Sequence, residues 1–566
     1  MTRTIDHDLV IVLAGEAGQG IQSIESILSS FLKKNGFHFY STSEFMSRVR
    51  GGTNSTEIRV SSRRVSAFRN RIDLLIPLHA EAVAHLGNRV TDETLILGDK
   101  AAVKHESMID VPFTQIAKET GSALYANTVA AGCICGLLKV DAEEGASFMY
   151  DHFSTKTDEV REKNREAFLK GYEAGTAIEA VRIQITASDT PKGEVMLSGS
   201  DAVSLGALAA GCDYMCGYPM SPATGVLQNM ADYSKRHDII VEQVEDEVGV
   251  VNMALGAWYA GARAFVTTSG GGFALMTEGI SLAGMIESPF VLHLAQRPGP
   301  ATGLPTRTEQ GDLDLVLYGG HGDFPRVILA PGTLEEAYTL TQKAFALAEK
   351  YQVPAFILTD QYFVDTRYNV PLFGVPETPP DRHIMQTDPD YRRFALTGSG
   401  ISPRGIPGYG EGLVCADSDE HDESGHITES MDMRVRMVEK RKKKHAALLA
   451  EAVPPTLSGA DNYKTLVICW GSTKPMVAEA LEELALPDVA MLHFSQVFPV
   501  PAGAAAILEK AEHIVSVENN SSAQFTRLLA TETGIPIRHT ILKYDGLPFS
   551  VEELAERLSS AVKEGK

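Results

Sequence analysis

The chain has 566 residues, enough for about three or four domains of roughly 100–200 residues each. Hydrophobic residues make up 44% and charged residues 22%, a composition that excludes disordered and fibrous classes. The net charge of −22, from 51 Lys+Arg and 73 Asp+Glu, argues against nucleic acid as the main partner, because nucleic-acid binding uses a basic surface.

The six cysteines contain no C-x-x-C pair, so their spacing fits neither a zinc site nor a ferredoxin-type cluster. They are predicted to be reduced, buried thiols, as in cytosolic proteins. The first 20 residues lead into an apolar run and glycines rather than a signal peptide. Residues 123–140 are apolar but include Asn127 and Thr128, which favours a buried helix over a membrane span. We therefore expect a cytoplasmic protein with no metal on this chain and no membrane contact.

The first block, residues 1–187, is predicted to be an α/β domain. Asp8–Ala14 is a continuous apolar run typical of a strand buried on both faces, and a helical pattern follows over 21–34. The turn between them, GEAGQG at 15–20, permits three interpretations: a tight strand-to-helix turn, a contact with an anion or CoA, or a NAD site. The NAD interpretation is disfavoured because that fingerprint is G-x-G-x-x-G. A polar linker follows at 188–193.

The second block, residues 194–375, alternates strand-like and helix-like segments, which predicts a parallel sheet covered by helices. A ligand site in such a sheet lies at the carboxyl ends of the strands. Residues 376–455 are irregular, and His421 and His426 lie there among acids, where a hydrogen-bonded loop is favoured over a metal site. The third block, residues 456–566, alternates again. The elements expected in the second block are strands at 239–244, 264–269 and 290–295 and a helix at 247–259.

Four motifs of the second block are candidates for chemistry. In YPMSPAT at 218–224, prolines fix hydroxyls at a helix start. In EDE at 245–247, the acids precede a helix whose dipole they complement. In TTSGGGF at 267–273, glycines leave a bare backbone that a ligand can approach. The fourth is a stiff loop in which Arg297 and Arg307 suit bidentate binding of a carboxylate. The motifs are YPMSPAT at 218–224, EDE at 245–247, TTSGGGF at 267–273 and the loop 296–312.

In order, spacing and composition, these motifs resemble the α subunit of the 2-oxoacid:ferredoxin oxidoreductases, thiamine-diphosphate enzymes that include pyruvate:ferredoxin oxidoreductase. The first block, with SRVRGGTNS at 47–55, resembles the γ subunit of that family fused ahead of α. The third block, with VENNSSAQ at 517–524, resembles its second α domain. The stretches SPRGIPGYGEG at 402–412 and EHDESGHITE at 420–429 resemble the branch that acts on 2-oxoglutarate.

The resemblance implies an α/β protein of several parallel-sheet domains. These are a γ-type domain at 1–187, a thiamine-diphosphate pyrimidine-binding-like domain at 194–375, an irregular inserted segment at 376–455 and a transketolase C-terminal-like domain at 456–566.

The resemblance also implies roles for particular residues. Glu247 matches the carboxylate that bonds to N1′ of the thiamine pyrimidine and favours the imino form; a solvated acid at a helix start is the alternative. Arg307 is the first candidate for the substrate carboxylate and Arg297 the second, and Ser221 matches a substrate-contacting hydroxyl. Further candidates are Thr306 and Thr224 as substrate contacts or turn braces, Tyr218 and Pro219 as cofactor contacts, and Arg50 as a contact to the distal carboxylate or a surface arginine.

The implied reaction is the oxidative decarboxylation of a 2-oxoacid, reversible in principle, in which CoA takes the acyl group and ferredoxin the electrons. 2-Oxoglutarate is the favoured substrate and pyruvate the alternative. The sequence has no cysteine quartet and no G-D-G…N diphosphate motif. The resemblance implies that Mg²⁺ and a [4Fe–4S] cluster are carried by a β subunit, in an (αβ)2 complex. Two rival hypotheses are a non-catalytic interaction subunit and an independent NAD-dependent oxidoreductase built on the first block.

Overall fold

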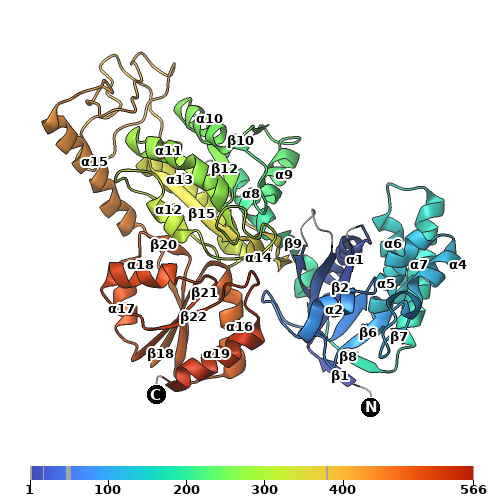
Figure 1. Ribbon diagram of the computed structural model, residues 1–566. Helices are drawn as coiled ribbons and strands as arrows, with labels where there is room; N and C mark the ends of the chain where they lie inside the picture. The colour runs from blue at the N-terminus through green and yellow to red at the C-terminus, as the bar shows by residue number, and fades with distance from the viewer. Residues whose placement is uncertain (1–2, 17, 46–51, 378–379, 565–566) are drawn as a thin grey trace. The chain divides into compact units, whose positions relative to one another are not determined.

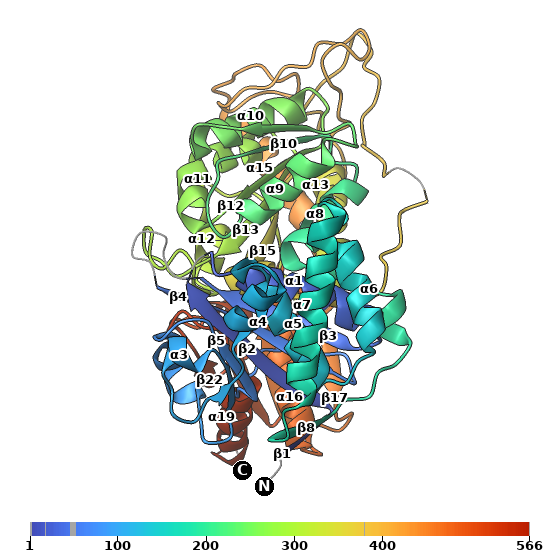
Figure 2. The same ribbon diagram turned by 90° about the vertical axis from the view of Figure 1, so that its right-hand side faces the viewer.

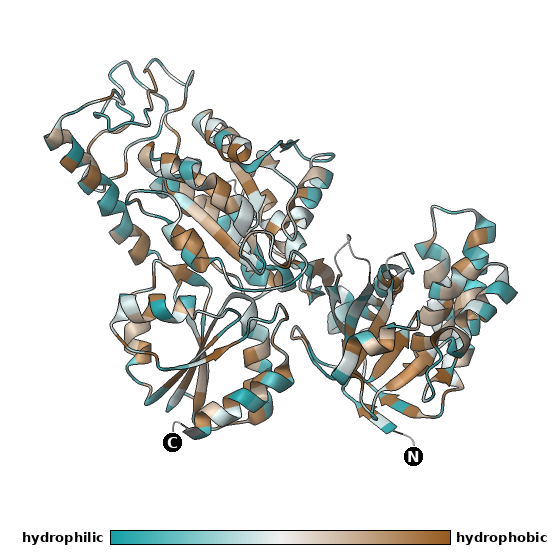
Figure 3. Ribbon diagram, viewed as in Figure 1, coloured by the Kyte–Doolittle hydropathy of each residue, from teal (hydrophilic) through white to brown (hydrophobic). Residues whose placement is uncertain are grey.

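The computed structural model describes residues 3–16, 18–45, 52–377 and 380–564, which form two compact units. Unit 1 comprises residues up to Leu197 together with Asp365–Leu372, and unit 2 comprises Ser198–Val364 together with the chain from Phe373 onward. Both units are α/β, with mostly apolar strands inside (Figure 1, Figure 3). Within the described residues, none of the helices has the length and apolar character that crossing a membrane requires.

Unit 1 contains a mixed sheet in the order β7-β6-β5-β2-β4-β3-β16-β9. The central strand β2 is buried, lies parallel to β5 and is antiparallel to β4, so the sheet is parallel on one side only. The strands are β2 (Asp8–Glu16), β3 (His38–Glu44), β4 (Thr53–Ser61), β5 (Leu74–Pro77), β6 (Leu95–Gly98), β7 (Ile109–Asp110), β9 (Val195–Ser198) and β16 (Arg367–Val370), with β1 (Arg3–Asp6) and β8 (Val181–Gln184) as a separate parallel pair.

Helices α4, α5 and α7 cover this sheet in the view of Figure 2. Helix α5 coincides with the apolar stretch 123–140 and is almost entirely buried, as the sequence predicted. It can lie close to α7 because glycines face the partner backbone: a Cβ on Gly132 would be 2.2 Å from Phe168 O. The helices are α1 (Ile21–Lys34), α2 (Ala82–Leu86), α3 (Lys100–Val103), α4 (Phe113–Thr120), α5 (Ala126–Leu137), α6 (Ala142–His152) and α7 (Asp158–Thr176).

Unit 2 begins with a sheet in the order β11-β10-β12-β13-β15-β14-β20, parallel except for β20. Two helix pairs pack beside it, α8 with α13 and α10 with α11. Its strands are β10 (Tyr214–Gly217), β11 (Ile240–Gln243), β12 (Ala264–Thr268), β13 (Phe290–Gln296), β14 (Val327–Leu329), β15 (Pro354–Asp360) and β20 (Gln496–Phe498). Its helices are α8 (Gly199–Ala209), α9 (Thr224–Tyr233), α10 (Glu247–Tyr259), α11 (Gly270–Met285), α12 (Leu313–Tyr318), α13 (Leu334–Tyr351) and α14 (Gln361–Asp365).

The segment 376–455 is held to the rest of unit 2 by buried ion pairs, although its first part lacks regular structure. Its basic run lies on α15 (Met431–Ala450), where Lys440 Nζ is 2.5 Å from Glu287 Oε1 and Lys444 pairs with the other oxygen. Burial alone would raise the pKa of Glu287, but Lys444 and Lys440 lower it to about 2. His421 lies in a hydrogen-bonded loop, its Nδ1 3.0 Å from Asp419 O.

The third block forms a five-stranded sheet in the order β17-β19-β18-β21-β22. All pairs in it are parallel except β17 with β19. Its strands are β17 (Thr456–Gly459), β18 (Thr465–Trp470), β19 (Val489–Phe494), β21 (His513–Glu518) and β22 (His539–Leu542), and its helices are α16 (Lys474–Leu484), α17 (Ala504–Leu508), α18 (Gln524–Thr533) and α19 (Val551–Glu564).

Candidate active site

The sheet of unit 2 brings three of the four predicted motifs to one edge. Strands β10, β12 and β13 are neighbours and parallel, so their carboxyl ends meet. The loop at 218–223 follows β10, helix α11 follows β12, and the loop at 297–312 follows β13. The fourth motif starts α10, which packs against α11. This edge is where a ligand site is expected in a parallel α/β sheet.

Glu247 is the buried acid of the EDE motif. It is the first residue of α10 and only 4% exposed, whereas Glu245 and Asp246 are exposed, and Asp246 Oδ1 caps the helix by accepting from Gly249 N at 2.7 Å. Glu247 Oε1 has no hydrogen-bond partner among the described residues. A buried acceptor without a donor costs about 1–3 kcal/mol, so it marks a place where a ligand can supply the missing donor.

A glycine of α11 makes room for this carboxylate. A Cβ on Gly272 would lie 2.8 Å from Glu247 Oε1 and 2.2 Å from Thr268 Oγ1, so any side chain there would displace the acid. Gly271, one residue earlier, is exposed, and the position of its absent Cβ is 4.0 Å from Met220 Sδ. The first turn of α11 therefore contacts Glu247 on one side and approaches the 218–224 loop on another.

The YPMSPAT residues lie on the surface of this edge. Tyr218 is 39% exposed, and Pro219 and Ser221 are also exposed, so their side chains are accessible to a ligand. Thr224 is half-buried and begins α9. Arg297 Nη1 donates to Ser221 O at 2.7 Å and thereby joins this loop to the loop that follows β13.

Arg297 is half-buried, and burial lowers the pKa of its guanidinium, an effect that Asp312 opposes. Asp312 was not predicted from the sequence. Its carboxylate lies against α11, since a Cβ on Gly270 would be 2.4 Å from Asp312 Oδ1, and its Oδ2 is buried with no partner among the described residues. Burial, and then the charge of Glu309, raises the pKa of Asp312 to about 7.

Arg307 and Thr306 are half-buried and lie farther along the same loop, where it meets the third block. Thr308 N donates to Gly546 O at 3.1 Å, and the position of a Cβ on Gly546 is 3.2 Å from Arg307 Cβ. Arg50 lies outside the described residues. The structure therefore collects Glu247, Ser221 and Arg297 around the strand ends and adds Asp312 to them.

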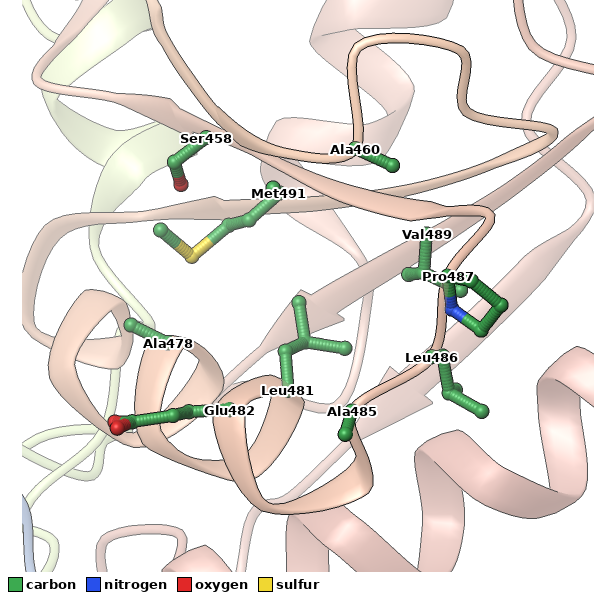
Figure 4. Close-up of a pocket in the computed structure, with 11 residues that line it drawn as sticks. Ser458, Ala460, Ala478, Leu481, Glu482, Ala485, Leu486, Pro487, Val489 and Met491 are labelled. Atoms are coloured by element: carbon green, nitrogen blue, oxygen red, sulfur yellow. The ribbon is translucent and has the colours of Figure 1, made fainter.

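A cavity elsewhere in unit 2 lacks this chemistry. It has a volume of about 400 Å³ and lies in the third block beside α16, lined mainly by apolar side chains such as Leu481, Val489 and Met491 (Figure 4). None of the predicted site residues lines it. The edge of the first sheet of unit 2 therefore remains the candidate active site.

Comparison with known proteins identifies two families along the chain. Residues 205–440 match the family described as pyruvate flavodoxin/ferredoxin oxidoreductase, thiamine diphosphate-binding, and residues 10–174 match the pyruvate ferredoxin/flavodoxin oxidoreductase family. The α/β fold and these two matches place the chain in the class of oxidoreductases with a thiamine-diphosphate-binding domain.

The relatives narrow this class. The α subunit of a 2-oxoacid:ferredoxin oxidoreductase from a Sulfolobus species is 30% identical over 98% of this chain and 97% of its own length. The chain belongs to the family of 2-oxoacid:ferredoxin oxidoreductase α subunits. The 2-oxoglutarate synthase subunit KorA of Methanocaldococcus jannaschii is 32% identical over 57% of this chain and 88% of its own length. The structure of 2-oxoglutarate:ferredoxin oxidoreductase from Magnetococcus marinus, with 2-oxoglutarate, coenzyme A and succinyl-CoA bound, matches with a TM-score of 0.92 and 30% identity over 98% of this chain and all of that one.

Proposed function

We propose that this chain is the fused γα subunit of an enzyme that converts 2-oxoglutarate and CoA to succinyl-CoA and CO2. Two electrons leave the substrate in this reaction and reduce two one-electron ferredoxins, with release of one proton. The observation that carries the proposal is the buried Oε1 of Glu247 beside Gly272, an oxygen that has no hydrogen-bond partner in the part of the chain that the structure describes. The similarity to relatives named for 2-oxoglutarate supports the choice of substrate.

The residues present fit thiamine diphosphate. When bound, thiamine diphosphate would supply a carbanion nucleophile and an electron sink for the decarboxylation. Glu247 would accept a hydrogen bond from the pyrimidine at Oε1, which is buried and has no donor among the described residues. Tyr218 and Pro219 are exposed on the adjoining loop, where they offer surfaces to the cofactor.

The substrate is held by the cations of the same edge. 2-Oxoglutarate has two carboxylates, and the loop 297–312 carries two arginines. Arg307 binds the carboxylate next to the ketone, Arg297 is the second cation, and the Ser221 hydroxyl and Thr306 donate to substrate oxygens. Arg50 remains a candidate for the distal carboxylate.

A β subunit is expected to cover the exposed side of α10 and α11. Residues 248–262 carry no charge, yet Val248 is 49% exposed and Met253 40% exposed; on α11, Leu275 is 55% exposed. Exposed apolar side chains on an uncharged helix surface such as that of α10 are typical of subunit interfaces, and α11 adds Leu275 although it also exposes one charge, Glu278. The partner would carry the diphosphate site, Mg²⁺ and the [4Fe–4S] cluster in an (αβ)2 complex.

The test is to purify the complex without air and follow reduction of a low-potential dye. We expect reduction with 2-oxoglutarate that depends on CoA, and little with pyruvate. Reduction by pyruvate alone would refute the substrate assignment. Absence of reduction by either, in a complex shown to contain thiamine diphosphate and cluster, would refute the catalytic function and favour a non-catalytic subunit.

A further inference from the structure

We call residues 297–312, which carry Arg297 and Arg307, the arginine loop. The third block holds this loop through a fully buried glutamine, Gln310. Gln310 Nε2 donates to Trp470 O at 2.9 Å, and Gln310 Oε1 accepts from Asn519 N at 2.9 Å. In the main chain, Gln310 N donates to Asn519 O at 2.7 Å, and Gln310 O accepts from Asn520 Nδ2 at 3.1 Å. Both main-chain groups and both side-chain polar atoms of Gln310 are therefore bonded to the third block.

Gln524 extends these contacts along the same loop. Its Nε2 donates to Gly311 O at 2.8 Å, and its Oε1 accepts from Asp314 N at 3.0 Å. Asn519, Asn520 and Gln524 all come from the sequence run VENNSSAQ at 517–524. We call Gln310, Asn519, Asn520 and Gln524 the amide clasp.

The clasp rests on a rigid base. Glu518 is fully buried, and its carboxylate accepts from Asn520 Nδ2 at 2.9 Å, Phe525 N at 2.9 Å and Thr526 N at 2.8 Å. Trp470 Nε1 also donates to Glu518 Oε2, at 3.3 Å. A buried carboxylate with this many donors fixes the start of α18, and hence the amides that reach the loop.

A second branch of the clasp reaches Arg307. Asn519 Nδ2 donates to Lys543 O at 2.9 Å and Leu547 O at 3.4 Å, so it holds the turn that contains Gly546. Gly546 accepts from Thr308 N, and its bare Cα lies against the stem of Arg307. Its φ of +84° is one that glycine adopts readily, so Gly546 supplies both the turn and the clearance.

The loop needs such support because it has no regular structure of its own. Residues 297–312 contain neither helix nor strand, and a free loop of this length samples many conformations. Fixing a binding group in advance removes the entropic cost of ordering it when the ligand arrives.

We propose that the amide clasp is a positioning device that presents the Arg307 guanidinium to the substrate, so that the third block contributes to substrate binding without touching the substrate. The proposal rests on the proposed function of Arg307. The clasp residues are positioning residues, and their effect must pass through Arg307.

The test compares Gln310→Met and Gln524→Met with Gln496→Met in the complex purified with its native partner subunits. Gln496 is an equally buried glutamine whose Nε2 and Oε1 bond to main-chain groups away from the loop, so it controls for the loss of a buried amide. We expect the clasp variants to raise KM for 2-oxoglutarate roughly ten- to a hundred-fold with kcat and KM for CoA within about two-fold, and the control to change neither. An unchanged KM for 2-oxoglutarate in both clasp variants would overturn the proposal.

The Arg307→Ala background separates this proposal from the function it rests on. There, Gln310→Met should add less than about two-fold to KM, because residues that act through one another are not additive. If Gln310→Met raised KM in the Arg307→Ala background as much as it does in the wild type, the clasp would act independently of Arg307 and would be merely structural. If Arg307→Ala itself leaves KM unchanged, the substrate site is wrong, whatever the clasp does. Should Gln310→Met fail to assemble, Gln524→Met decides: faster hydrogen exchange at 304–314 with unchanged KM would refute positioning.

Discussion

Replacement of Glu247 by Gln should stabilise the isolated chain while it abolishes turnover. Glu247 Oε1 is buried and has no hydrogen-bond partner among the described residues, and a carboxylate in that state costs about 1–3 kcal/mol more to bury than a neutral amide of the same shape. Against this, a negative charge at the start of α10 contributes about 0.3–1 kcal/mol through the helix dipole. The difference leaves a net gain of about 1 kcal/mol in the variant's free energy of unfolding. This corresponds to roughly 2–4 °C in Tm for a domain of the size of the second block.

The assay is thermal unfolding of the chain alone, then of the complex with thiamine diphosphate and Mg²⁺, beside dye-linked turnover. The cofactor should raise Tm more for wild type than for Glu247→Gln, since only the carboxylate gains a charge-assisted hydrogen bond, and turnover should fall at least about 100-fold. Glu245→Gln, which changes an exposed acid two residues earlier, should alter neither. A variant that melts earlier and still turns over would show that Glu247 is only a structural acid.

Three further changes test other parts of the molecule. Arg307→Ala should raise KM for 2-oxoglutarate by roughly 100-fold and leave KM for CoA nearly unchanged, which steady-state kinetics measures. Asp312 has its pKa raised from 3.8 to about 7 by burial, so the folded chain keeps the proton to higher pH than the unfolded chain and stability falls as pH rises through that window. In Asp312→Asn the loss of unfolding free energy between pH 5 and pH 8 should be smaller by on the order of 2 kcal/mol; an equal loss in both proteins would contradict the assignment. Glu287→Gln should cost about 3–5 kcal/mol in denaturant unfolding because Lys440 and Lys444 lose their buried counter-charge, whereas Glu439→Gln on the exposed side of α15 should cost little.

In the sheet of unit 1, the sequence predicts the parallel strand β2 but not the antiparallel strands β3 and β4. The helix over 21–34 and the three strands predicted at 239–244, 264–269 and 290–295 are found because their patterns are local, whereas β14 and β15 of the same block are not predicted. Strands β3 and β4 escape prediction because their runs mix polar and apolar residues. The pairing of β16 with β3, Tyr368 with Tyr40, joins residues more than 300 positions apart, which no local pattern can reveal.

The site shows a similar limit. Three acids in a row at 245–247 all suit a helix start, and only the contact with Gly272 of another helix determines which one is buried. Asp312 precedes α12 and reads as an ordinary N-cap, yet its side chain makes no capping bond and lies instead against Gly270. In both cases the deciding contact comes from α11, so the local sequence leaves the acid's environment open.

The substrate side of the site, around Arg307, and the cofactor side, around Glu247, differ in how many of their polar groups are already bonded within the chain. Gln310 has all its polar groups bonded, so the arginine loop is fixed before any ligand arrives. Glu247 Oε1 has no bond from the described residues and lies at the start of a helix whose exposed side is uncharged. Cofactor and partner binding therefore adds contacts that the chain lacks on the Glu247 side, whereas substrate binding does not have to order the arginine loop. We expect measurable affinity for 2-oxoglutarate only after the complex has assembled with its cofactor, because the fixed arginine loop supplies only part of the substrate's contacts and the cofactor and partner supply the rest.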